Sequence, residues 1–191
     1  MNNRKKALIL TLCLALVLVL NVSGRTLAYY TATGTATNVI TTGAIRFKIH
    51  EHNGDGVPFP TQSIRVRAGD KVSKRVAVEN ICSQPFYLRI RLTNGVENAD
   101  LPVEDIFTFY PNTTDWTHHE DGCYYYNTVL QPGQITNPLI REVEINRERV
   151  GKQYEGKTLT LAVTVEAVQS KNNPAEQPWL AVGWPGEGGS V

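Results

Sequence analysis

The chain has 191 residues, of which 41% are hydrophobic, with 19 basic and 18 acidic side chains. A chain of this length fits one domain with a buried core. Its charge is balanced and no basic run occurs beyond residue 28, which argues against nucleic acid and anionic membrane surfaces as partners.

The first 30 residues have the layout of a secretory signal peptide. Basic residues at positions 4–6 precede an apolar run, Ala7–Leu20, and small residues follow before Ala28. This pattern predicts cleavage between Ala28 and Tyr29, which removes residues 1–28 as a signal peptide. An uncleaved anchor is the alternative, but a membrane-spanning helix needs about 20 apolar residues. We therefore expect a secreted protein that contacts the membrane only through the uncleaved signal.

The mature chain is mildly acidic and keeps two cysteines. Residues 1–28 contain four of the basic residues and no acid, which leaves a net charge of −3. Cys82 and Cys123 remain after cleavage, and an even pair in an exported chain suggests a disulfide. The bond requires that two strand ends adjoin, so that the Cα atoms lie within about 7 Å. Two unpaired thiols are the alternative.

The mature sequence reads as short strands separated by Gly, Pro, Asn and Asp. Residues 86–92 alternate most clearly, with Phe86, Leu88 and Ile90 on one side. Further strands are expected at residues 44–50, 64–66, 72–80, 106–110, 123–129, 139–145 and 159–167. This pattern predicts an all-β, two-sheet antiparallel sandwich over residues 29–169.

Residues 170–191 are rich in Pro and Gly, and we expect them to form a poorly ordered tail. Trp179 and Trp184 are the only aromatic residues there, with large apolar surfaces to bury.

Several weak motifs occur in a fixed order along the mature chain. They are Thr26–Thr31, Ala36–Gly43, Val66–Val72, Val78–Asn80 with Pro85–Ile90, Gly122–Asn127, Leu130–Thr136 and Val165–Gln169. Together they resemble the TasA/camelysin family of exported proteins from Gram-positive bacteria. One departure is Ala68, which stands where the family's turn usually has Pro.

The resemblance implies a jelly-roll sandwich, export by the Sec route, processing by the family's dedicated signal peptidase, and a role at the cell surface or in the biofilm matrix. It also implies self-association into fibres, in which each subunit donates an N-terminal strand to the next. An added strand pairs the free N–H and C=O groups of a sheet edge. The candidate donor is uncharged and β-prone, and it contains Tyr29, Tyr30, Thr31, Thr33, Thr35, Thr37, Val39 and Ile40. The alternative is that this segment pairs within its own domain.

Camelysin-like members have been assigned metalloprotease activity, so a secreted metalloprotease is the alternative function. The chain lacks the His-Glu-x-x-His motif of many zinc proteases. Its histidines, which are weak candidates for metal ligands, are His50, His52, His118 and His119. If these two pairs converged, Glu51 or Glu120 could activate a bound water. We expect exposed polar residues instead, with no catalytic site and no cofactor.

An aromatic cluster offers one further alternative. Trp116 and Tyr124–Tyr126 could stack on sugars, as in a carbohydrate-binding module. Such aromatics more often pack between sheets.

Overall fold

The computed structural model describes residues 30–38, 45–97 and 100–185, and it confirms the all-β sandwich. Its strands are β1 (Tyr30–Asn38), β2 (Phe47–His52), β3 (Ile64–Val66), β4 (Lys71–Ser73), β5 (Arg75–Asn80), β6 (Phe86–Val96), β7 (Phe107–Pro111), β8 (Trp116–His118), β9 (Cys123–Tyr126), β10 (Ile140–Ile145) and β11 (Thr158–Gln169). Two short 3₁₀ helices complete it, η1 (Lys152–Tyr154) and η2 (Pro178–Leu180). The predicted signal peptide, residues 1–28, and the cleavage site at Ala28 and Tyr29 lie outside the described residues.

The first layer is a six-stranded sheet in the order β3-β1-β11-β6-β9-β8. Its longest pair is β6 with β11, which are antiparallel over eleven register positions, from Leu159 opposite Val96 to Gln169 opposite Phe86. β11 shows the expected alternation, because every second residue from Leu159 to Ala167 is buried. One pair departs from the predicted antiparallel arrangement, since β1 runs parallel to β11.

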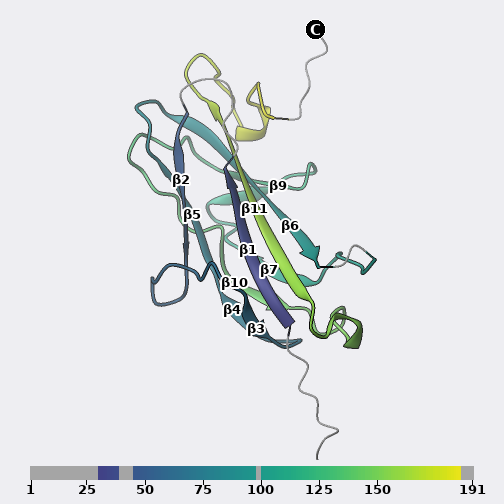
Figure 1. Cartoon of the computed structure of the whole chain (residues 1–191). Helices are drawn as coiled ribbons and strands as arrows, with labels where there is room; N and C mark the ends of the chain where they lie inside the picture. The colour runs from purple at the N-terminus through teal and green to yellow at the C-terminus, as the bar shows by residue number, and fades with distance from the viewer. Residues whose placement is uncertain (1–29, 39–44, 98–99, 186–191) are drawn as a thin grey trace, which may run out of the picture.

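The second layer contains β2 paired with β5, and β10 between β4 and β7. Backbone hydrogen bonds join these two groups, because Leu139 N donates to Val76 O (2.9 Å) and Lys74 N donates to Arg141 O (3.1 Å). Figure 1 shows β2, β5 and β10 beside β1 and β11 in an elongated molecule. Among the described residues, no helix has the length and apolar character needed to cross a membrane.

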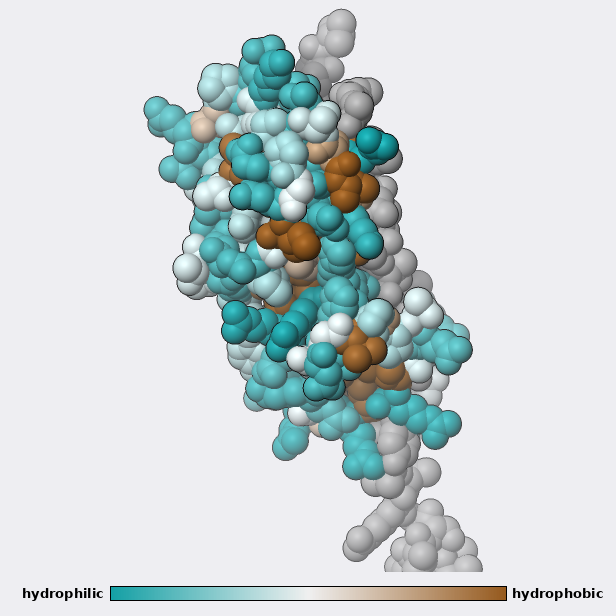
Figure 2. All heavy atoms as spheres, turned by 90° about the vertical axis from the view of Figure 1, so that its left-hand side faces the viewer, coloured by the Kyte–Doolittle hydropathy of each residue, from teal (hydrophilic) through white to brown (hydrophobic). Residues whose placement is uncertain are grey.

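The main core lies between the two layers. It combines inward residues of both layers, and its largest fully buried members include Trp116, Phe86, Leu88, Ile90, Ile140, Ile145 and Tyr154. Trp116 also contributes a polar contact, because its indole N–H donates to Asn137 O at 3.1 Å. By contrast, the face turned to the viewer in Figure 2 is mostly hydrophilic, and its apolar residues form small separate groups. That face therefore offers no large apolar docking surface.

The expectation of a poorly ordered tail is wrong for residues 170–185, which we call the C-terminal strap. The strap packs on the outer face of the six-stranded sheet, where Ala181 is 3% exposed and Trp184 is 2% exposed. Proline and glycine in the sequence suggested disorder, but burying an indole on a neighbouring sheet favours one conformation. Residues 186–191 lie outside the described part.

The core gives a direct stability prediction. Leu88→Ala removes a fully buried side chain from β6, so we expect the free energy of unfolding to fall by about 2–5 kcal/mol. Leu180→Ala is the matched control, because Leu180 is 60% exposed, and it should change the free energy by less than about 0.5 kcal/mol. Urea unfolding of both variants measures the difference, and equal effects would contradict this assignment of the core.

Candidate functional site

The predicted donor segment forms β1, and β1 lies inside the sheet of its own chain. It pairs in parallel with β11 over eight positions, from Thr31 opposite Thr158 to Asn38 opposite Val165. On its other side it pairs with β3 over three positions, Tyr30 to Ala32. Tyr29, Val39 and Ile40 of the predicted donor lie outside the described residues. The structure of the single chain thus contains the pairing that the sequence left as the alternative to donation.

The position of β1 makes β11 dependent on it. From Thr33 to Asn38, no described strand pairs with β1 on the β3 side. Along most of its length, β1 is therefore an edge strand held by the β11 ladder alone. Without β1, the backbone of β11 from Thr158 to Val165 would become a free edge, which is a template for another strand.

The histidine pairs are not brought together. His50 and His52 lie on the same side of β2, as predicted, with ring centroids 5.9 Å apart, and His50 Nε2 lies 2.7 Å from Glu79 Oε2. His118 stacks on Tyr124 at 4.5 Å, at the end of β8 in the other sheet. His119 stacks on Trp179 at 5.3 Å. Within the described residues, no three His, Cys, Asp or Glu side chains are grouped closely enough to hold a metal ion.

Glu51, one of the two candidate bases, is engaged in a buried ion pair. Its carboxylate lies 2.9 Å from Lys74 Nζ, and the two side chains are 17% and 3% exposed. Burial lowers the pKa of Lys74, and the contact with Glu51 offsets only part of that effect. The Lys74 ammonium also lies 4.1 Å from the centre of the Phe59 ring. The contact with Phe59 joins the loop after β2 to this pair.

The predicted disulfide between Cys82 and Cys123 is not formed, and both residues are free and buried. Cys82 precedes β6 and belongs to the main core, whereas Cys123 lies opposite Arg91 in the strand register and faces the other side of the sheet. Arg91 lies five positions beyond Phe86 in β6, a distance of about 17 Å along the strand. The expectation that the two strand ends adjoin is therefore wrong.

Two residues of the aromatic cluster are buried, and Tyr124 and Tyr126 are partly buried and pack against the main core, as the packing alternative expected. Trp116 and Tyr125 are each 1% exposed. Trp116 packs against Tyr126 in the main core at 5.1 Å, and Tyr125 lies beneath the C-terminal strap. Neither ring is available to stack on a sugar.

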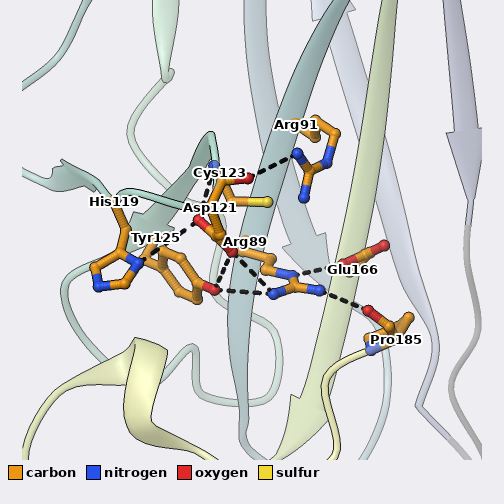
Figure 3. Close-up of polar contacts among 8 residues, drawn as sticks. All are labelled: Arg89, Arg91, His119, Asp121, Cys123, Tyr125, Glu166 and Pro185. Carbon is orange, nitrogen blue, oxygen red and sulfur yellow. Dashed lines mark hydrogen bonds and ion pairs between the residues drawn. The ribbon is translucent and has the colours of Figure 1, made fainter. Parts of the chain in front are cut away.

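The sequence did not reveal a polar network centred on Arg89, in the middle of β6 (Figure 3). Arg89 points to the outer face, as the alternation predicted, yet it is only 4% exposed. In the strand register it lies opposite Glu166 of β11 on one side and Tyr125 of β9 on the other. Its guanidinium donates to Glu166 (2.5 Å), to the Tyr125 hydroxyl (2.9 Å), to Asp121 (3.1 Å) and to the carbonyl of Pro185 (2.8 Å).

These contacts compensate for the burial of a charge. Burial alone would lower the pKa of Arg89, but the bonds to Tyr125 and Glu166 outweigh it and raise the pKa. Burial would raise the pKa of Asp121, but hydrogen bonds from the Cys123 N–H and the Tyr125 hydroxyl lower it below its usual value. The network is therefore built around a permanently charged Arg89 and an ionised Asp121.

Aromatic side chains close the network from outside. The Trp184 ring centre lies 4.7 Å from the guanidinium of Arg89, and the ring packs edge-on against Tyr125 at 5.4 Å. Tyr87, Cys123, Val168 and Ala181 complete this second apolar cluster. The sequence does show an arginine at an outward strand position and two tryptophans in the tail. It does not predict that these residues contact each other.

Comparison with protein-family models, curated proteins and solved structures found no match. Function is therefore inferred from the position of β1 and from the capped outer face of the large sheet.

The Asp121 contacts predict an acid-sensitive contribution to stability. Because the pKa of Asp121 is lowered in the folded state, its contribution is present above the unfolded pKa, near 4, and is lost as the pH falls through the folded pKa. Asp121→Asn should cost about 1–2 kcal/mol at pH 7 and should flatten the loss of stability as the pH falls below about 4. Glu120→Gln, at the exposed neighbouring position, should keep the parent's profile in urea unfolding. Identical profiles for the two variants would contradict the role of Asp121.

The cysteines give a second prediction. Mature protein denatured without reductant should show two titratable thiols, Cys82 and Cys123. In the folded protein Cys123 should react slowly with alkylating reagents, because it is buried and burial raises the pKa of its thiol to about 11. Cys82→Ser and Cys123→Ser assign each reaction. If the thiols became titratable only after reduction, the result would contradict the free cysteines and support a disulfide between Cys82 and Cys123.

Proposed function

We propose that this chain is a secreted structural subunit of the cell surface or biofilm matrix, which assembles into fibres by donating its N-terminal strand to a neighbouring subunit. The observation that carries the proposal is the place of β1, which is the first described strand and pairs in parallel with β11 at an otherwise open edge. The resemblance to the TasA/camelysin family leads us to expect that this strand is donated to a neighbouring subunit, whereas the single chain pairs it within its own sheet.

The proposal is supported first by register. A second copy carries the same residues 30–38, so it can offer β11 the same eight pairs that β1 makes within its own chain. Exchange then replaces each backbone hydrogen bond with an identical one, and the sheet needs no other rearrangement. The cost is the loss of three pairs with β3, unless the incoming strand also restores them.

Position in the chain gives a second support. Because β1 is the first of the described strands, it can leave the sheet without unthreading any other described element. The segment Tyr30–Asn38 contains no charged residue that would oppose pairing with another chain.

Processing fits the same scheme. Cleavage between Ala28 and Tyr29 would place the new N-terminus one residue before β1. In the precursor, residues 1–28 would remain attached to the donor strand. Removal of the signal peptide would thus release the donor strand at the moment of secretion.

Two adjacent proline substitutions test this assembly. Successive N–H groups of a strand point to opposite sides, so in Thr35→Pro and Ala36→Pro one variant loses a hydrogen bond to β11 and the other changes only the open side. We expect one variant to lose fibres seen by electron microscopy and the other to keep them. Urea unfolding at low concentration should show that both remain folded.

A truncation gives the matching test in trans. Protein that begins at Thr42 should not polymerise, but it should bind a peptide of residues 29–41. Val57→Ala, in an exposed loop, should assemble like the parent. Fibres made by the truncated protein would exclude donation by this segment. A mature chain that stays monomeric at high concentration would refute the fibre-subunit function itself.

A further inference from the structure

The C-terminal strap folds back directly after β11. Asn172 adopts a positive φ of 59°, and Asn173 N donates to Ser170 O at 3.1 Å, so the chain reverses here. The Asn173 side chain then fastens the returning segment. Its amide nitrogen donates to Gln169 O (3.1 Å) and Val182 O (2.9 Å), and its amide oxygen accepts from Val182 N (3.0 Å).

The strap contacts three strands from the outer side of the sheet. On β6, the Tyr87 hydroxyl accepts from Ala175 N at 3.1 Å, and Arg89 donates to Pro185 O at 2.8 Å. On β9, Tyr125 packs against Trp184. On β11, Val168 belongs to the same buried cluster as Trp184. The strap therefore clamps β11, β6 and β9 together.

This clamp acts next to the described ladder between β1 and β11. Among the residues that the structure describes, Val165 is the last residue of β11 that pairs with β1, and the next residue, Glu166, binds Arg89. In Figure 3, Glu166 and Pro185 both reach the guanidinium of Arg89. The strap and β1 thus act on neighbouring parts of one strand, the strap through side chains and β1 through the backbone.

Departure of β1 would leave β11 with a strand on one side only. A newly free edge opens locally and exchanges its amides faster than a central strand does. The contacts of the strap with β6, β9 and β11 do not involve β1, so they can persist when β1 leaves.

We infer that the C-terminal strap is a latch that keeps β11 aligned with β6 after β1 has left the sheet. The subunit then remains a folded acceptor for the N-terminal strand of a second copy of this chain. This inference rests on the proposed function, and it assigns to the strap the control of the acceptor edge.

The test uses the full mature chain with Cys82→Ser as background. Cys123 is 0% exposed beneath the strap, so its alkylation rate reports strap opening. Amide hydrogen exchange then compares β11 with β5, which belongs to the other layer. Capture of a labelled peptide of residues 29–41 measures the acceptor edge.

Trp184→Ala opens the strap, and Leu180→Ala is the control because Leu180 is an exposed strap residue. We expect Trp184→Ala to speed Cys123 alkylation and β11 exchange by at least about tenfold, with β5 unchanged. Peptide capture should weaken by at least about tenfold. Leu180→Ala should match the parent in all three measurements.

Faster Cys123 alkylation without faster β11 exchange would overturn the latch, as would unchanged peptide capture by Trp184→Ala. If β5 exchange also rises because Trp184→Ala unfolds the protein, Asn173→Ala, which removes only the fastening of the strap, is judged by the same criteria. A parent that neither captures the peptide nor assembles would refute the proposed function and with it the acceptor role. The exchange of β11 would still decide whether the strap holds that strand.

Discussion

The pairing of β6 with β11 is the interaction on which the rest of the structure depends. These strands share eleven register positions. The main core, the β1 ladder and the Arg89 network each form on a face or an edge of this pair. The inner face supplies fully buried residues such as Leu88 and Val163 to the main core. The free edge of β11 pairs with β1, and the outer face carries the Arg89 network. A shift of one residue in this register would turn the inward side chains outward and the outward ones inward. Such a shift would disrupt the main core and the Arg89 network together.

Burial of Arg89 imposes a second constraint. A guanidinium removed from water must be paired and hydrogen-bonded, or its charge destabilises the fold. Glu166 and Tyr125 meet this need from the two adjacent strands, and Pro185 meets it from the strap. Trp184 then covers the charged group and excludes water. The strap packs at this place because its Pro185 carbonyl accepts a hydrogen bond from the charged Arg89 and its Trp184 ring packs on Arg89 and Tyr125.

The two sides of β11 differ in how their contacts are specified. On the β1 side, the ladder is made of backbone groups, which an identical strand from another copy would match equally well. On the β6 side, the contacts include side chains at fixed register positions and a buried ion pair, which an incoming strand would not reproduce. This difference is why we assign exchange to β1 and retention to the strap.

The sequence by itself determined the strand class, the inward residues of β5, β6 and β11, and the outward direction of Arg89, because alternation fixes which side chains share a face. It also placed His50 and His52 on one side of β2. Only the tertiary structure decided which strands became neighbours. That decision put Cys82 and Cys123 on different faces, kept the histidine pairs apart, paired β1 in parallel with β11, and buried Trp184 over Arg89. Each of these outcomes depends on contacts between residues far apart in the chain, and local periodicity carries no information about such contacts.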